Sequence, residues 1–414
     1  MNAAAPTPLS TPGPARLMSL DVFRGATIAA MMLVNNPGNW NAVYPPLLHA
    51  EWHGWTFTDL IFPFFIWIVG VAIPLSTARR LEQGQSRSQL LLHAFRRSVI
   101  IFALGLFLNS FGYFIDGSLL RDGIPAWWHN YATTVRIPGV LQRIAICYFI
   151  ATLIFLNTGV RGQIFWTAGL LAGYWVLMIA GPLLGCGTGG LEPHGNFSEY
   201  IDNLVLNGPV IGMHVWKGGK TWDPEGIFST VPAIATCLFG ILTGHLLRSK
   251  QTPETRTAWL FVGGNLLLFA GAVMALGLPI NKKIWTSSYA VFMAGMAMNC
   301  FAVSYWLVDV QGWRKWAKPF AIYGMNAIAV FMLAGLLGRI LPAIKVATVA
   351  GKKVGLQGYL YDTLFVPFAS PDTAPFFGFL ASPKNASLMW ALIYIAGLYL
   401  VAYGMYRRKW FLKF

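Results

Sequence analysis

Long apolar stretches recur along this chain, and they limit its fold more than any other feature. A stretch of about 20 apolar residues is long enough to cross a bilayer as a helix. In lipid, a helix satisfies its own backbone hydrogen bonds. The sequence therefore predicts an all-α, polytopic integral membrane protein with about ten transmembrane helices. The expected helices lie at 18–36, 58–78, 98–115, 138–157, 164–184, 227–247, 258–278, 286–308, 319–341 and 386–405.

Composition and charge agree with this class. The chain is 56% hydrophobic and only 11% charged, whereas soluble domains are about 25% charged. This excludes a soluble nucleic-acid-binding protein, although the net charge is +15. If the N-terminus lies inside, most Lys and Arg residues fall in short inner segments. The positive-inside rule then predicts that both termini are cytoplasmic and that the basic excess reflects topology.

The chain divides into a tail and one large unit. Residues 1–15 are rich in Pro, Ala and Thr and predict a flexible tail. Residues 16–414 are expected to form a single transmembrane domain with long extracytoplasmic loops at 37–57, 185–226 and 342–385. These loops are rich in Trp, His, Gly and acidic residues, which is typical of sites for a polar ligand.

Two motifs place charged residues inside predicted helices. In SLDVFRG, Asp21 and Arg24 are three residues apart and share a helical face, as a structural ion pair or a functional one. In RIPGVLQR, Gln142 and Arg143 lie inside a span. A buried arginine calls for an anion, either a carboxylate such as Asp21 or Asp59 or a ligand phosphate. Interhelical hydrogen bonding is the alternative role for these polar side chains.

The segment from Asn35 to Asp59 combines groups suited to proton transfer. It contains the sequence HAEWHG, with His49 and His53, and ends at Asp59, which heads the next span. Histidine titrates near neutral pH, and a carboxylate that accepts its second N–H fixes its tautomer. An interfacial structural role is the alternative. A metal site is not expected, because His49 and His53 lack a third ligand.

Three further motifs carry polar residues near predicted helix ends. In WDPEGI, the acidic residues complement a helix dipole, or Trp222 and Glu225 bind a sugar by stacking and hydrogen bonding. In NKKIWTSSY, the polar residues Asn281, Lys282 and Ser288 face outward. Asn326 of YGMNAI lies inside a span, where its amide needs a partner.

Together and in this order, several segments closely resemble the heparan-alpha-glucosaminide N-acetyltransferase family of transmembrane acyltransferases, in a compact bacterial-type form. Against the lysosomal members, the resemblance leads us to expect a form without their N-terminal lumenal domain and extra helix, with a longer loop from Asn35 to His49 and with His53 in place of an amide-type residue. The similarity covers residues 16–414, and small amino sugars or cell-wall fragments are the acceptors we expect. The matching segments are RLMSLDVFRG, HAEWHG, TDLIFPFFIWIVG, RIPGVLQR, DPEGI, NKKIW and YGMNAI.

The resemblance implies transfer of acetyl from cytosolic acetyl-CoA to the amine of a glucosamine-type sugar on the extracytoplasmic side, without a metal. His49 is the expected active-site base or acetyl carrier. Asn35 is its polar neighbour and a candidate to hold the thioester oxygen, a role worth about 3 kcal/mol. A homodimer in a bacterial cytoplasmic membrane, surrounded by lipid, is also implied. Candidate acetyl-CoA contacts are Arg24, Arg143, Gln142 and Asn326; candidate acceptor contacts are Asp59, Trp222, Glu225, Asn281, Lys282 and Ser288.

A different function class also fits these features. A membrane transporter of N-acetylglucosamine or a related amino sugar uses buried polar residues and Gly- or Pro-broken spans along its path. The two functions differ in their need for acetyl-CoA and for the imidazole of His49.

Overall fold

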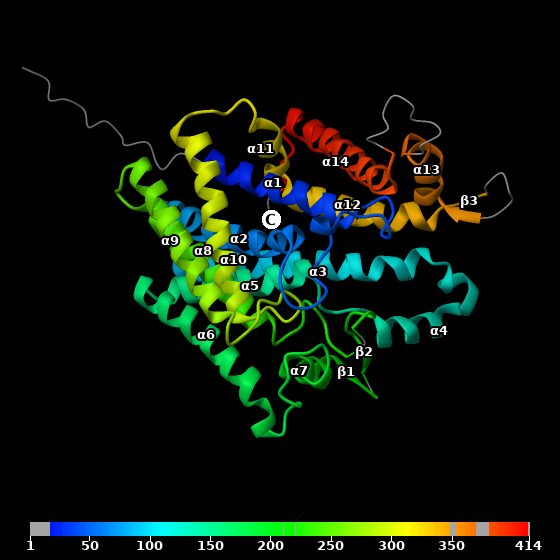
Figure 1. The fold of residues 1–414 in the computed structure, drawn as a ribbon, viewed down its shortest axis with the longest axis horizontal. Coiled ribbons are helices and arrows are strands. Elements are labelled where there is room, and N and C mark those ends of the chain that lie inside the picture. The colour runs from blue at the N-terminus through cyan, green and yellow to red at the C-terminus, as the bar shows by residue number, and fades with distance from the viewer. Residues whose placement is uncertain (1–16, 210, 220, 348–352, 370–380, 413–414) are drawn as a thin grey trace, which may run out of the picture.

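The computed structural model describes residues 17–209, 211–219, 221–347, 353–369 and 381–412. The tail expected at 1–15 lies outside these residues. The regular structure of the described residues is almost all helical, with two short antiparallel hairpins (Figure 1). The all-α prediction is therefore confirmed.

Eight helices in the described residues are long and apolar enough to cross a membrane. A ninth span is formed if the bent pair α11 (Lys318–Met325) and α12 (Ala327–Ala343) counts as one. The first helix, α1 (Met18–Asn35), carries Asp21 and Arg24 and is not among the eight. The polytopic class is confirmed. The eight are α2 (Phe57–Glu82), α3 (Arg87–Ile115), α5 (Val140–Asn157), α6 (Val160–Ala180), α8 (Thr230–Arg248), α9 (Pro253–Met274), α10 (Ser287–Tyr305) and α14 (Pro383–Arg407).

The span expected at 319–341 is not straight. Helices α11 and α12 meet at Asn326 with a bend of 80°. Asn326 leaves the helical conformation, and its side chain bonds to the C-terminal segment, donating to the carbonyl of Trp410 at 3.1 Å and accepting from the N–H of Leu412 at 3.2 Å. The amide has found the partner that a buried polar group requires.

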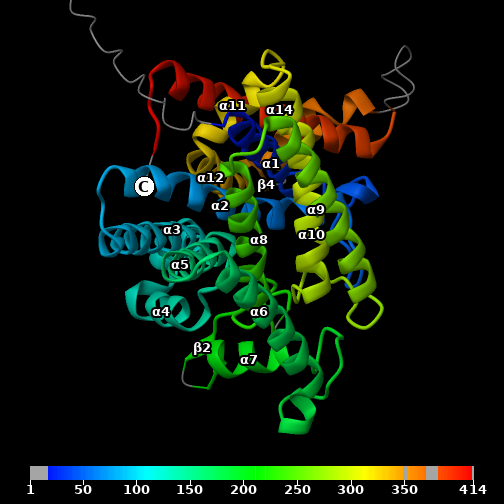
Figure 2. The same cartoon turned by 90° about the vertical axis from the view of Figure 1, so that its left-hand side faces the viewer.

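The predicted outer loops contain regular elements that apolar runs do not reveal. Helix α4, with a break at Gly123, follows α3, and Figure 1 shows it with α13 and β3 at one end of the molecule. Both ribbon views place α7 and β2 together on another side (Figures 1 and 2). These elements are η1 (Pro45–Leu47), α4 (Ser118–Thr134), η2 (Gly181–Leu184), α7 (Phe197–Leu206), β1 (Asn207–Gly208) paired with β2 (Gly212–Met213), η3 (Trp306–Val310), β3 (Lys345–Ala347) paired with β4 (Lys353–Gly355), α13 (Leu356–Leu364) and η4 (Pro367–Ala369).

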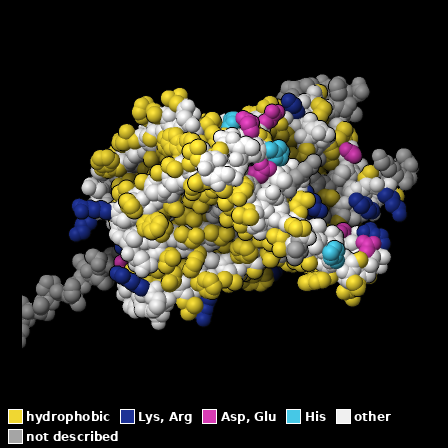
Figure 3. All heavy atoms as spheres, turned by 90° about the horizontal axis from the view of Figure 1, so that it is seen from below, with side chains coloured by type: hydrophobic (Ala, Val, Ile, Leu, Met, Phe, Trp, Pro, Cys, Tyr) yellow, Lys and Arg dark blue, Asp and Glu magenta, His cyan; other side chains and the backbone are white. Residues whose placement is uncertain are grey.

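The outer faces of the helices are apolar. On α9, exposed side chains recur every three or four residues, at Trp259, Val262, Leu266, Phe269 and Val273. This spacing forms one stripe along the helix. Figure 3 shows a face on which hydrophobic side chains predominate and charged ones are sparse. Such a surface is suited to lipid contact, and the chain is an integral membrane protein.

Close helix contacts at glycine hold α1 and α2 in place. A Cβ atom on Gly25 of α1 would lie 1.7 Å from the carbonyl oxygen of Phe320 in α11. A Cβ atom on Gly70 of α2 would lie 2.0 Å from the carbonyl oxygen of Cys237 in α8. Glycine is needed here because the two backbones touch. These contacts fix the two helices whose facing ends carry Asn35 and Asp59.

Replacing Gly25 by Ala is expected to destabilise the protein by about 3 kcal/mol, because the clash is with backbone and cannot be relieved by a side-chain rotation. SDS titration of the folded protein in mixed micelles measures the change. Gly404 in α14 is the matched control, since a Cβ atom there meets nothing within 4 Å. Gly404→Ala should be neutral or slightly stabilising. Equal stability of the two variants would contradict the prediction.

Candidate active site

A cavity of about 390 Å³ lies where α1 ends and α2 begins. We call it the histidine cavity; its lining includes Asn35, His49, Asp59, Glu225 and Lys282. These five residues come from four segments that are far apart in the chain: the end of α1, the loop and start of α2, the segment before α8, and the connection from α9 to α10. The fold thus brings together five of the residues that the sequence singled out.

His49 and Asp59 form a hydrogen-bonded pair. The Nδ1 atom of His49 lies 2.7 Å from Oδ1 of Asp59. The other oxygen, Oδ2, accepts from the backbone N–H groups of Ala50 and Thr56, both at 3.0 Å. Because the groups around the carboxylate are donors, Asp59 acts as the acceptor and Nδ1 of His49 carries the hydrogen. The Nε2 atom of His49 is then the nitrogen that can accept a proton.

Asp59 and His49 differ in how far their side chains are exposed to solvent. Asp59 is 1% exposed, whereas the side chain of His49 is 45% exposed. The hydroxyl of Tyr289 also donates to the backbone carbonyl of Asp59 at 2.6 Å and ties the start of α2 to α10. Asp59 was expected to bind the acceptor, and this stays a prediction; in the structure its buried carboxylate is hydrogen-bonded to His49.

The segment from the end of α9 to the start of α10 places Lys282 in the lining of the histidine cavity. Two other expected acceptor contacts from this segment, Asn281 and Ser288, are buried outside the cavity. Asn281 is buried, and its Oδ1 accepts from the N–H groups of Lys283 at 2.8 Å and Ile284 at 3.2 Å. Ser288 is also buried, with its Oγ 3.1 Å from Oγ1 of Thr286. Neither Asn281 nor Ser288 lines the histidine cavity. Asn281 shapes the turn that presents Lys282.

Arg136 is tied to two acidic residues of the DPEG segment. Its Nε and Nη2 atoms donate to the two oxygens of Asp223 at 2.8 and 2.6 Å, and Nη2 also donates to Glu225 at 2.5 Å. Burial alone would lower the pKa of Arg136, but the two carboxylates outweigh this and raise it. The three residues form what we call the Arg136 cluster, which fixes one wall of the histidine cavity.

Trp222 does not offer the stacking surface that the sequence suggested. It is buried and packs edge-on against Trp52 and Trp216, with ring centroids 5.3 and 5.8 Å away. Trp52 and Trp216 line the cavity instead. The sequence pattern could not identify them, because tryptophan is common in all the outer loops of this chain and only packing decides which rings face the cavity.

We expect the loss of folding stability at low pH to depend on Glu225. Burial would raise the pKa of Glu225, but the charges of Arg136, Arg143 and Lys282 outweigh this and lower it. The folded state therefore gains stability from the ionised form at pH values above the ordinary value of 4.5, and loses it as pH falls through the lowered pKa. SDS titration from pH 7 down to about pH 2, which passes through the lowered pKa, should show a steeper loss of stability below pH 4.5 in the wild type than in Glu225→Gln. Parallel curves would contradict this.

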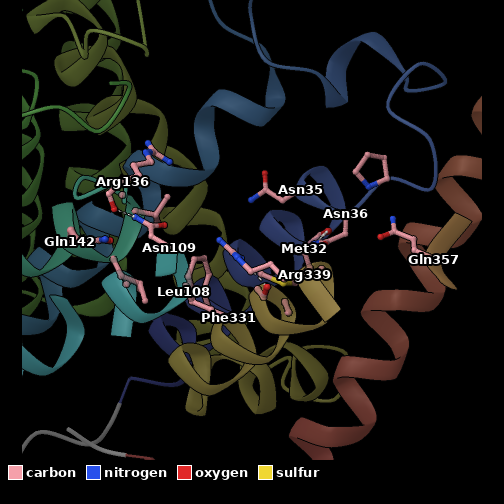
Figure 4. Close-up of a pocket in the computed structure, with 18 of the residues that line it drawn as sticks. Met32, Asn35, Asn36, Leu108, Asn109, Arg136, Gln142, Phe331, Arg339 and Gln357 are labelled. Atoms are coloured by element: carbon pink, nitrogen blue, oxygen red, sulfur yellow. Dashed lines mark hydrogen bonds between the residues drawn. The ribbon is translucent and has the colours of Figure 1, made fainter. Parts of the chain in front are cut away.

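A second cavity of about 420 Å³ adjoins the first (Figure 4). Amide side chains are prominent in its lining, namely Asn35, Asn36, Asn109, Gln142 and Gln357, and we call it the amide cavity. Three residues line both cavities: Asn35, Arg136 and Val140. Within the described part of the chain, the side chain of Asn35 makes no hydrogen bond, so its amide is available to a ligand in either cavity.

Figure 4 shows a further cation in the amide cavity. Arg339 of α12 reaches into the space between Asn35 and Asn109. Its Nη1 atom donates to the carbonyl of Gly335 at 2.8 Å, in its own helix. Gln142 also lines this cavity, and its Nε2 donates to the carbonyl of Ile137 at 3.0 Å.

Arg143 lies behind the cavities and has a different kind of partner from the one expected. It is 1% exposed, and its Nη2 donates to the carbonyl of Gly226 at 3.1 Å and to Oγ of Ser229 at 2.5 Å. Its guanidinium also lies 5.1 Å from the centre of the Trp285 ring. Among the described residues its hydrogen bonds go to a carbonyl and a hydroxyl and not to Asp21 or Asp59, in line with interhelical hydrogen bonding, the alternative that the sequence left open. A ligand phosphate as partner stays a prediction. A helix turns about 100° per residue, so Gln142 faces the amide cavity while Arg143 faces α8.

Arg24 and Asn326 lie at the other end of α1. Arg24 donates to Asp21 at 3.1 Å, which forms the expected pair, and to the carbonyl of Gly324 at 3.4 Å. Asn326 follows Gly324 at the bend between α11 and α12. Asn35 lies eleven positions after Arg24 along the helix, a distance of about 17 Å along the axis. The four candidate acetyl-CoA contacts thus lie in three places. Gln142 lines the amide cavity and Arg143 is buried behind it. Arg24 and Asn326 lie near the start of α1.

Comparison with known proteins gives the same family as the motifs. A family model described as a domain of unknown function, DUF5009, matches residues 16–115. The heparan-alpha-glucosaminide N-acetyltransferase of Homo sapiens is 30% identical over 365 residues, covering 77% of this chain and 52% of the human protein. The Mus musculus enzyme is 30% identical over 363 residues, 77% of this chain and 53% of the mouse protein. The chain spans about half the length of these relatives. These matches confirm the resemblance seen in the motifs: the chain belongs to the same sequence family as the heparan-alpha-glucosaminide N-acetyltransferases.

Proposed function

We propose that this protein is a transmembrane N-acetyltransferase that moves acetyl from cytosolic acetyl-CoA to the amine of a glucosamine-type sugar on the extracytoplasmic side. The observation that carries the proposal is the His49–Asp59 pair, at 2.7 Å, opening onto a cavity beside Asn35. The relatives are named as N-acetyltransferases that act on a glucosaminide, which supports the same reaction class here.

The proposed chemistry needs a base at the histidine cavity. An amine attacks a thioester only through its free electron pair, so a proton must leave the amine nitrogen as the new C–N bond forms. Nε2 of His49 takes this proton, while Nδ1 keeps its hydrogen bond to Asp59. The C–S bond then breaks, and CoA leaves as the thiol after His49 returns the proton. The amide N–H of Asn35 holds the carbonyl oxygen while it carries negative charge.

A carrier scheme uses the same residues in a different order. His49 first takes the acetyl group from the thioester on Nε2 and then passes it to the sugar amine. Incubation with radiolabelled acetyl-CoA in the absence of a sugar separates the two schemes. Label bound to the protein and lost in His49→Ala supports the carrier scheme. Absence of label in a protein that acetylates glucosamine supports the base scheme.

The proposed membrane arrangement follows from α1. With the N-terminus in the cytoplasm, Arg24 and Asn326 lie toward the inner side and the histidine cavity toward the outer side. An acetyl-CoA molecule would then extend from Arg24 toward Asn35, about 17 Å away along α1, with Gln142 beside its path in the amide cavity. We place Glu225 and Lys282 at the acceptor. A homodimer in a bacterial cytoplasmic membrane completes the proposal.

Transfer of radiolabelled acetyl from acetyl-CoA to glucosamine by purified protein in detergent tests this function. Labelled N-acetylglucosamine from the wild type supports it. Failure to form product, together with uptake of N-acetylglucosamine into proteoliposomes without acetyl-CoA, would favour a transporter and overturn the proposal. Failure of both assays would show that neither activity acts on these sugars.

A further inference from the structure

Asp202 of α7 is a buried carboxylate that lines neither the histidine cavity nor the amide cavity. It is 0% exposed. Its Oδ2 accepts from the backbone N–H of Asp223 at 3.2 Å, and its Oδ1 accepts from the backbone N–H of Ile227 at 2.8 Å. One carboxylate thus holds the first residue of the DPEG segment and the residue that directly follows the segment.

The DPEG segment is packed tightly against this carboxylate. A Cβ atom on Gly226 would lie 1.9 Å from Oδ2 of Asp202, so no side chain fits between them. On the opposite side, the carbonyl of Gly226 accepts from Nη2 of Arg143 at 3.1 Å and from Oγ1 of Thr230 at 2.6 Å. The backbone of the segment is therefore held by α7 through its N–H groups and by α5 and α8 through a carbonyl.

The segment that Asp202 holds forms part of the wall of the histidine cavity. Pro224 and Glu225 line the cavity directly. The carboxylate of Asp223 accepts from the backbone N–H of Trp216 at 2.7 Å, and Trp216 also lines the cavity. Asp202 therefore acts on the cavity through residues that it positions and not through a contact of its own.

The His49–Asp59 pair is held by other parts of the chain. The hydrogen bonds to Asp59 described above come from the loop before α2 and from Tyr289 of α10, not from α7 or the DPEG segment. A shift of the DPEG segment should therefore change the binding of the acceptor and leave the base in place.

We propose that Asp202 is a positioning residue for the acceptor: it holds the DPEG segment so that Glu225 and Trp216 face the amino sugar. This inference rests on the proposed function for its role in acceptor binding. The hold of Asp202 on the segment concerns the free protein and can be measured without a substrate.

Amide hydrogen exchange, followed by mass spectrometry of peptides from residues 216–229, measures this hold. Asp202→Asn keeps the shape of the side chain but leaves one acceptor oxygen, and its NH₂ group faces a backbone N–H. The N–H groups of Asp223 and Ile227 should therefore exchange faster by about tenfold or more. Burial raises the pKa of Asp202 to about 7, so the measurement is made at pH 8, where the carboxylate is largely ionised.

Glu199→Gln is the matched control. Glu199 lies on the same helix and is also buried, but it accepts from the backbone N–H of Gly195 and from the hydroxyl of Thr221. Glu199→Gln makes the same change of charge as Asp202→Asn. It should leave the exchange of Asp223 and Ile227 close to that of the wild type.

The kinetics of acetyl transfer to glucosamine give the second readout. In Asp202→Asn the KM for glucosamine should rise about tenfold, while kcat stays within about twofold of the wild type, because the lost contacts bind the acceptor and the His49–Asp59 pair is intact. Gly226→Ala pushes the segment away from Asp202 and should have the same effect. It serves as the second variant if SDS titration in mixed micelles shows that Asp202→Asn is unstable. A purely structural role would lower the amount of active protein and leave KM unchanged.

The two proposals fail in different ways. Unchanged exchange in folded Asp202→Asn and Gly226→Ala proteins, or an equal increase in Glu199→Gln, would overturn the role of Asp202. Faster exchange with an unchanged KM would overturn it as well and leave the proposed function in place. Faster exchange in a protein that acetylates no amino sugar would support the hold of Asp202 on the segment and overturn the proposed function.

Discussion

Replacing His49 by Ala is expected to lower the rate of acetyl transfer to glucosamine by about 10²–10⁴-fold, the usual contribution of a general base. The loss should be largely in kcat, because the imidazole acts during bond formation rather than in binding. If His49 is instead the acetyl carrier, the loss should be complete. The buried Asp59 carboxylate keeps its hydrogen bonds from the N–H groups of Ala50 and Thr56, and Lys282 at 3.5 Å, so we expect the variant to fold with a modest loss of stability. Product formation from radiolabelled acetyl-CoA gives the rate.

His53 is the matched control for His49. It lies on the same loop, four residues away, and its nearest partners are Glu192 at 3.8 Å and the side chain of Asn281 at 3.4 Å. His53→Ala should retain most of the activity. Asp59→Asn should fall between the two, because an amide can donate to Nδ1 and favour the wrong tautomer of His49. Full activity in His49→Ala would remove the basis of the proposed mechanism.

Replacing Arg136 by Met is expected to have the largest effect on stability, a loss of about 3–5 kcal/mol. Asp223 has a fully buried side chain and Glu225 is 12% exposed, so removal of the guanidinium leaves two buried carboxylates without their cation. The wall of the histidine cavity should loosen as well, and the KM for the acceptor should rise. SDS titration in mixed micelles gives the stability change, and acetyl transfer at varied glucosamine concentration gives KM.

The Arg121–Asp122 pair is the control for the Arg136 cluster. It joins the same residue types at 2.8 Å, but its side chains are 69% and 40% exposed. Water already solvates both groups there, so Arg121→Met should leave the stability nearly unchanged. Arg136→Lys should retain part of the stability, because lysine keeps the charge but cannot make the forked contact with Asp223. A loss of stability in Arg121→Met as large as in Arg136→Met would show that burial does not increase the contribution of the Arg136 cluster to stability.

The sequence alone predicted the spans well and the other elements poorly. Apolar length is a local property, so α2, α5 and α10 could be located within a few residues of their ends. Helix α3 begins at Arg87, well before the expected start at residue 98, because its first turns carry polar and basic residues. Helices α4, α7 and α13 were missed, because their mixed composition resembles that of a loop. The bend at Asn326 was also missed, since it depends on hydrogen bonds to residues 84 and 86 positions away.

The sequence identified the chemistry of the site but not the partners of each residue. His49 was recognisable from its loop, and Asp59 from its place at the head of a span. That Asp59 holds His49, and that Lys282 joins them from a segment more than 200 residues later, followed only from the packing of α2 against α10. Arg136 stood outside the predicted site because its carboxylate partners lie 87 and 89 residues away.

Arg143 is a second example of a residue whose partners the sequence could not predict. The sequence correctly placed a polar and charged pair, Gln142 and Arg143, inside a helix, because the apolar residues around them define the span. It could not tell which of the two faces a cavity, since neighbouring residues point about 100° apart and only the packed helices distinguish one direction from another. Class, spans and reactive residue types are thus set by local sequence. Which residues meet is decided by tertiary contacts, because the distances between segments depend on how the helices pack.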